Sequence, residues 1–221
     1  MFKSYENPLE GLPLRYLIGT DSPSGDGILE CGYDSNFGII AYCNLFDEKN
    51  QGNYGPYLHN SDTAQQYNEG QIDPKGPGWL KNLNEQFSRR RESGFQYVEL
   101  DNPDAYDWSS VLSAIDLARS YQLKVIAKNP GLCQNPESYV AHPNIYGIIV
   151  EKGAGNVHSM HNLRIKAKKP TLPIWFVSFG DGRSWAMDMA NQAVGLPNIG
   201  VTYSSQGEYG NSIDILIPNE L

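Results

Sequence analysis

The feature that most constrains the fold is a regular alternation, from Gly94 onward, of short apolar runs with segments of helical periodicity. The runs are almost continuously apolar, which is typical of strands buried on both faces of a parallel sheet. Between two of them, Val111, Leu112 and Ile115 recur at helical spacing. The expected strands of this half are Phe95–Asp101, Lys124–Lys128, Tyr146–Glu151, Pro173–Ser178 and Asn198–Tyr203. Such a chain is expected to form an α/β fold.

The N-terminal half is expected to complete the same sheet. Two strands are predicted at Leu14–Ile18 and Gly38–Asn44, and a weak one at Gly70–Ile72. A helix over Trp79–Arg90 has its apolar residues on one face. A total of about seven or eight strands favours a closed (β/α)8 barrel of the TIM type. A degenerate or missing barrel unit is expected near residues 47–77, which are polar and rich in Gly, Asn and Tyr.

Length and charge restrict the possibilities further. The chain has 221 residues, enough for one sizeable core, so a single domain over residues 1–221 is expected. Its formal net charge of −8 argues against nucleic acid as a partner. No apolar run approaches the roughly 18–20 residues of a membrane span. The start at Met1 lacks a signal peptide, so we expect an intracellular protein or one whose leader has been removed.

The thiols and imidazoles do not form a recognisable metal site. Cys31, Cys43 and Cys133 contain no CxxC pair, which excludes a disulfide framework or a zinc motif. His158 and His161 lie three residues apart in a predicted helix, without a third ligand. We therefore expect solvated surface histidines and neither a metal nor another cofactor.

Polar residues gather where the predicted strands end, and in a parallel barrel these ends face one mouth. Asp101 and Glu151 would supply the two carboxylates that glycoside hydrolysis needs. The sequence does not set the distance between them, so retaining and inverting chemistry both stay open. The other residues expected to bind substrate are Asp21, Tyr42, Asn102, Asp104, Lys128, Asn129 and Tyr203.

Several of these residues also have structural interpretations. Asp101–Asp104 is a good turn sequence, in which Asp and Asn side chains can serve only backbone donors. Lys128 is expected either to form a structural ion pair with Glu151 or to tune the carboxylates and bind substrate. Glu99, on the same strand as Asp101, is expected to form a structural ion pair. In the polar loops, Tyr54, Tyr57 and Tyr67 are expected to offer stacking surfaces to a sugar.

The segment Gly94–Asp104 resembles the glycine-phenylalanine … aspartate-asparagine-x-aspartate signature of the endo-α-1,4-polygalactosaminidase family, glycoside hydrolase family 114. Ala127–Asn129 is similar to the lysine-asparagine strand end of that family, and the next strand finishes in a glutamate, Glu151. Ile39–Tyr42 and Gly78–Leu80 resemble its second strand and the start of its tryptophan-leucine helix.

This resemblance, over residues 38–205, implies a barrel enzyme that cleaves α-1,4-linked galactosamine polymers, in a family that is largely extracytoplasmic. It implies Asp101 as nucleophile and Glu151 as acid/base, roles that could be exchanged. A cationic amino-sugar polymer suits an acidic protein. The chain departs from the family pattern at Pro77, where the family has an acid near the tryptophan, and beside Glu151, at Val150 and Lys152.

Two other functions stay open. The first is a catalytically silent carbohydrate-binding barrel, which the departures around Glu151 favour. The second is an isomerase or aldolase that uses Lys128 for a Schiff base or for proton transfer, which requires the lysine to lose its charge. Two neighbouring carboxylates would oppose that loss, so this interpretation ranks last.

Overall fold

The computed structural model describes residues 15–20, 28–34, 38–47, 53–58, 70–92, 94–204 and 215–217. Its strands are β1 (Arg15–Thr20), β2 (Ile28–Asp34), β3 (Gly38–Asn44), β4 (Tyr97–Asp101), β5 (Lys124–Lys128), β6 (Ile145–Glu151), β7 (Ile174–Phe179), β8 (Ile199–Ser204) and β9 (Ile215–Ile217). Its helices are α2 (Pro77–Glu92), α3 (Trp108–Ser120), α4 (Pro136–Ala141), α5 (Val157–Lys166) and α6 (Arg183–Ala193). Three short 3-10 helices follow strand ends, at η1 (Pro103–Ala105), η2 (Pro130–Leu132) and η3 (Gly180–Gly182).

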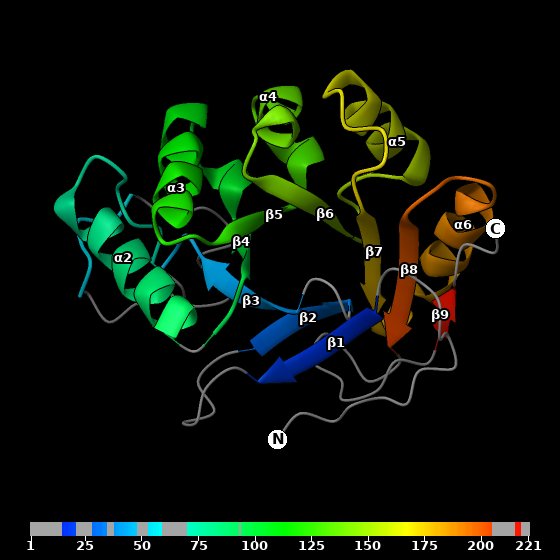
Figure 1. Cartoon of the computed structure of the whole chain (residues 1–221), viewed down its shortest axis with the longest axis horizontal. Helices are drawn as coiled ribbons and strands as arrows, with labels where there is room; N and C mark the ends of the chain where they lie inside the picture. The colour runs from blue at the N-terminus through cyan, green and yellow to red at the C-terminus, as the bar shows by residue number, and fades with distance from the viewer. Residues whose placement is uncertain are drawn as a thin grey trace.

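The strands form one sheet in which the spatial order follows the chain order from β1 to β9. From β3 to β8, each strand is parallel to the next, and helices alternate with these six strands. Helices α2 to α6 follow one another in an arc along the outer side of the strands (Figure 1). The expected α/β fold is therefore confirmed, because each parallel strand from β4 to β8 is reached through a helical crossover.

The N-terminal part differs from the expectation. The strand β2 was not predicted from the sequence. It is antiparallel both to β1 and to β3. At Gly70 and Ile72 the chain makes only isolated bridges, to Asp47 and Tyr57, in place of the weak strand. Gly70 and Gln71 have low strand propensity, so no continuous ladder of strand hydrogen bonds forms there. A short β9 also closes antiparallel onto β8.

Side chains alternate between the two faces of the parallel strands. One face packs on the helices and holds most of the core, including Val98, Ala127 and Val150. The opposite face carries a separate apolar cluster that contains Tyr97, Ile126, Ile149, Trp175 and Val177. Because the side-chain period of a strand is two, Glu99, Asp101, Lys128 and Glu151 lie on this second face. It is apolar toward the amino ends of the strands and polar toward their carboxyl ends.

Gly147 makes room for the largest side chain of this inner cluster. A Cβ atom at that position would lie 2.5 Å from the Trp175 ring, closer than real Cβ contacts allow. The indole therefore lies over the backbone of β6 and fills the inner face below the polar residues.

Over the described ranges, none of the helices is long and apolar enough to cross a membrane.

Candidate functional site: four charged side chains at the carboxyl ends of the strands

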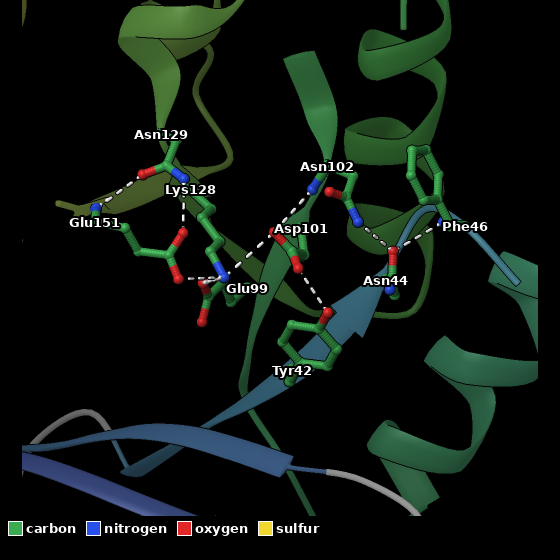
Figure 2. A network of polar contacts seen from close by, with 9 residues as sticks. All are labelled: Tyr42, Asn44, Phe46, Glu99, Asp101, Asn102, Lys128, Asn129 and Glu151. Atoms are coloured by element: carbon green, nitrogen blue, oxygen red, sulfur yellow. Dashed lines mark hydrogen bonds and ion pairs between the residues drawn. The ribbon is translucent and has the colours of Figure 1, made fainter. Parts of the chain in front are cut away.

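Lys128 is the centre of the polar cluster. It is the last residue of β5, and its side chain is only 6% exposed. Its Nζ lies 3.6 Å from Glu99, 3.3 Å from Asp101 and 3.0 Å from Glu151 (Figure 2). Three carboxylates from β4 and β6 thus converge on one ammonium group, which carries three N–H donors.

Asp101 is held by three separate donors. Tyr42 donates its hydroxyl to Oδ2 at 2.6 Å, and the backbone N–H of Asn102 donates to Oδ1 at 2.9 Å. The ammonium of Lys128 contacts Oδ1 as well and also lies over the Tyr42 ring, 5.6 Å from its centroid. Both carboxylate oxygens are therefore fixed, while 17% of the side chain stays exposed.

Glu151 is held by Asn129 in two ways. The Asn129 side chain donates to Oε2 at 3.0 Å, and its Oδ1 accepts the backbone N–H of Glu151 at 2.9 Å. Lys128 takes the other oxygen, Oε1. At 27% exposure, the Glu151 side chain reaches solvent more than that of Asp101.

Two asparagines in the left-handed region turn the chain away from these strand ends. Asn102 has φ 59° and Asn129 has φ 44°, and each is followed by a proline that begins a 3-10 helix. Asparagine tolerates this conformation better than most residues, and proline fixes the φ angle that the next turn requires. The chain therefore bends sharply, and each asparagine amide is turned back onto a neighbouring strand.

A buried amide network supports Asp101 from behind. Asn102 donates to Asn44 Oδ1 at 2.8 Å, and the same oxygen accepts the Phe46 N–H at 2.9 Å (Figure 2). On α2, Gln86 accepts from the Asn44 N–H at 3.1 Å and donates to its carbonyl at 2.7 Å. Helix α2 is thereby tied to the end of β3 and, through Asn44, to the turn after Asp101.

Asp104 lies at the same end of the sheet, in the turn after β4, and over the described ranges it forms no ion pair. Although this residue is exposed, surrounding protein atoms partly desolvate the carboxyl and raise its pKa above the usual value. The negative charges of Asp101 and Glu151 raise the pKa of Asp104 further. Asp104 therefore lies close enough to both carboxylates to feel their charge.

Other sequence-predicted residues lie outside the cluster around Lys128 or outside the described residues. Tyr203 is buried and donates its hydroxyl to the Gly180 carbonyl at 2.6 Å, outside the cluster around Lys128. Tyr54 donates to Glu85 at 2.6 Å, which links its segment to α2. Tyr57 similarly donates to Asp47 at 2.7 Å. Asp21 and Tyr67 lie outside the described residues.

Two features near the mouth add to the picture. Lys152 and Asp181 form an exposed ion pair of 2.7 Å that joins the loop after β6 to the loop after β7. Burial raises the pKa of the Cys133 thiol to about 12, so this thiol is a poor nucleophile. In the part of the chain that the structure describes, no three His, Cys, Asp or Glu side chains are grouped to hold a metal ion.

Comparisons with known proteins bear on the fold. No family model matches the sequence, and no curated protein matches it significantly. The structure superimposes on Aspergillus fumigatus Ega3, solved in complex with galactosamine, with a TM-score of 0.54 and 13% sequence identity. The match covers 79% of this chain and 77% of that chain. The chain shares the fold of Ega3.

The glycoside hydrolase domain of PelA from Pseudomonas aeruginosa was also found, with a TM-score of 0.46 and 12% identity over 76% of this chain and 78% of that chain. At these identities a shared fold does not fix a shared activity, because one fold hosts many sites. The function has to be argued from the side chains at the mouth.

Proposed function

We propose that this protein is a glycoside hydrolase that cleaves an α-linked amino-sugar polymer, with Asp101 and Glu151 as its catalytic carboxylates. The observation that carries the proposal is that both carboxylates, from β4 and β6, contact the same Lys128 Nζ. Glycosidases need two carboxyl groups on opposite sides of one scissile bond, and this arrangement brings two of them to one point.

The spacing supports a retaining reaction. Lys128 Nζ lies 3.3 Å from an oxygen of Asp101 and 3.0 Å from an oxygen of Glu151. The two oxygens nearest the ammonium therefore lie no farther apart than the sum of these two distances, which accommodates the roughly 5–5.5 Å separation of retaining enzymes. We therefore propose the retaining reaction.

Exposure and hydrogen bonding support the assignment of roles. Lys128 is more deeply buried than either carboxylate, so a sugar would approach from the solvent side, above the ammonium. Asp101, with both oxygens fixed, suits a nucleophile that must attack along one direction. Glu151, which is more exposed, suits an acid/base that exchanges a proton with the leaving group and with water.

An amino sugar is the substrate class that the charges favour. Asp104 adds a carboxyl to a mouth that already holds three carboxylates and one ammonium. A cationic sugar would be attracted by this field, and the whole chain carries a formal net charge of −8. The fold neighbour Ega3 was solved with galactosamine, and the Gly94–Asp104 motif resembles a family that acts on galactosamine polymers.

A catalytically silent sugar-binding barrel is the second candidate, and one observation favours it. Both oxygens of Glu151 are already engaged, one by Lys128 and one by Asn129. A glutamate held in this way would have to release one contact before it could protonate a leaving group.

The test is release of reducing ends from partly deacetylated α-1,4-galactosamine polymer. Wild type and the control Asp188→Asn, an exposed carboxylate on α6, should both release reducing ends. Asp101→Asn and Glu151→Gln should each lower the rate by at least about 100-fold. Silence of the folded wild type, combined with retained binding of the polymer, would establish the binding barrel in place of the hydrolase.

A further inference from the structure

Glu99 is a buried carboxylate that a two-carboxylate mechanism leaves without a task. It lies on β4 two residues before Asp101, with 0% exposure, and its Oε1 is 3.6 Å from Lys128 Nζ. Burying a charge is costly unless an opposite charge compensates it. A glutamate at the floor of a proposed active site, beneath the lysine that joins both catalytic carboxylates, therefore calls for an explanation.

We propose that Glu99 is a positioning residue that anchors Lys128, so that the ammonium can transfer its ion pair from Asp101 to Glu151 during the reaction. This inference rests on the proposed hydrolase function and deepens it. In this role Glu99 acts on the catalytic carboxylates through Lys128.

The charges of the retaining reaction show why such an anchor is needed. In the first step, an Asp101 oxygen attacks the anomeric carbon, the bond to the leaving oxygen breaks, and the proton of Glu151 moves to that oxygen. Asp101 is then a neutral ester and Glu151 is an anion. In the second step, water attacks the same carbon, its proton returns to Glu151, and the ester bond breaks to restore the Asp101 anion.

At each stage one of the two catalytic carboxyls is neutral and the other is charged. If only Asp101 and Glu151 were present, Lys128 would have one anionic partner at a time, first Asp101 and then Glu151. Glu99 adds a constant negative charge, so Lys128 keeps two anionic partners throughout, and the summed charge of the four groups stays the same. The three carboxylates around Nζ match the three N–H donors of the ammonium, which permits the exchange without movement of the lysine.

The environment of Lys128 is consistent with a fixed pivot. The side chain is 6% exposed, and its ammonium is also bounded by the Tyr42 ring. Tyr42 donates to Asp101, so Asp101 keeps a hydrogen-bond donor when its charge is lost. Asn129 does the same for Glu151. Each catalytic carboxyl therefore has its own neutral donor, and Lys128 is shared between them.

The first arm of the experiment needs no activity. Lys128→Met, which leaves Glu99 buried without its ammonium, should lower the midpoint of thermal unfolding by on the order of 10 °C. Adding Glu99→Gln to that variant should recover a large part of the loss, because the uncompensated charge is removed. If the effects of the two substitutions simply add, Glu99 is not the anchor of Lys128 and the inference is overturned.

The second arm measures catalysis in the whole protein. Glu99→Gln keeps the shape of the side chain and removes its charge, whereas Glu99→Asp keeps the charge. With the galactosamine polymer, Glu99→Gln should lower kcat about 10- to 100-fold at unchanged KM, and Glu99→Asp should retain more activity than Glu99→Gln. With 4-nitrophenyl α-D-galactosaminide, the burst amplitude should be unchanged in Glu99→Gln, because both steps lose the same constant charge.

The outcomes separate the inference from the proposed function. An active wild type with normal kcat in Glu99→Gln, or with Glu99→Asp as the weaker variant, would overturn the anchoring role and leave the hydrolase intact. An inactive wild type would refute the proposed function. In that case the unfolding measurements still decide whether Glu99 and Lys128 are coupled.

Discussion

Lys128 and Arg164 are both buried cations, yet they lie at opposite ends of the parallel strands and are compensated in different ways. Lys128, at the carboxyl end of β5, is surrounded by three carboxylates. Arg164, on α5, donates to the Leu172 carbonyl before β7 and to the Pro197 carbonyl before β8, each at 2.8 Å. The first cation is held by charges and the second by backbone oxygens.

The nature of the partners indicates what each end does. Carbonyl groups at the amino ends of the strands receive donors from Arg164 and from Lys169, whose Nζ donates to the His142 and Ile145 carbonyls at 2.6 and 2.8 Å. Those cations complete hydrogen bonding that the loops cannot supply themselves. The carboxylates at the other end repel one another and satisfy no backbone group. Their repulsion lowers the free energy of unfolding, a trade that is common at functional sites.

The largest effect should come from the carbonyl-bound end. Arg164→Met leaves the Leu172 and Pro197 carbonyls without a donor, at about 1–3 kcal/mol each. Thermal unfolding should show a midpoint lowered by on the order of 10 °C, while kcat per folded molecule on the galactosamine polymer stays unchanged. A lowered kcat in the folded variant would show that the two ends are coupled and would break the comparison.

An intermediate effect should come from the asparagine that holds Glu151. Asn129→Gly preserves the left-handed backbone but removes both contacts with Glu151, so kcat should fall about 10-fold with little change in unfolding temperature. Asn102→Gly keeps the backbone N–H that holds Asp101 and loses the bond to Asn44, so it should affect stability more than kcat.

Lys168→Gly is the matched control, because Lys168 also has a positive φ, 59°, and is exposed in the turn between α5 and the amino end of β7. It should leave kcat unchanged. If it lowers kcat as Asn129→Gly does, backbone flexibility and not the Glu151 contacts would be responsible.

The smallest effect should appear as acid sensitivity of the carbonyl-bound end. Desolvation lowers the pKa of His161, and the Arg164 guanidinium lowers it further. The unfolded chain therefore binds the proton more readily. The stability is fully present above the unfolded pKa of about 6.5 and is lost as the pH falls below it and through the lower folded pKa. The unfolding midpoint should drop by a few degrees between about pH 7 and pH 5.

His161→Asn keeps an acceptor for Arg164 but cannot titrate, so it should reduce this drop, whereas His158→Asn should not. His142, whose pKa is lowered mainly by desolvation, contributes a loss of the same sign that remains in both variants. An identical pH dependence in wild type and His161→Asn would assign the whole effect to other groups.

Most of the parallel strands were predictable because a strand buried on both faces has to be apolar throughout. The prediction for Lys124–Lys128 matches β5, and Pro173–Ser178 differs from β7 by one residue at each end. By contrast, β2 contains Glu30 and Gly32 and pairs only with antiparallel neighbours, so it lacks this continuous pattern. Sequence periodicity therefore identifies the parallel strands that are covered on both faces and misses this antiparallel strand between β1 and β3.

The candidate site was predictable as a set of strand ends and not as a set of contacts. The carboxyl ends of the parallel strands bring Tyr42, Asp101, Lys128 and Glu151 together. Lys128 forms the expected ion pair with Glu151, and Asp101 accepts a backbone N–H as its turn sequence predicts. Gln86 was missed because it is 42 residues from Asn44, and nothing local shows that a helix amide would bind a strand end. The sequence analysis expected His161 to be solvated and did not predict that Arg164 donates to its Nδ1.

The two prolines that follow Asn102 and Asn129 have a consequence for the lifetime of the protein. Asparagine ordinarily ages to aspartate through a succinimide, formed when the nitrogen of the following residue, after losing its hydrogen, attacks the side-chain amide. Pro103 and Pro130 carry no hydrogen on that nitrogen, so the ring cannot close in this way. A site already crowded with carboxylates is thus protected from acquiring two more by the succinimide route.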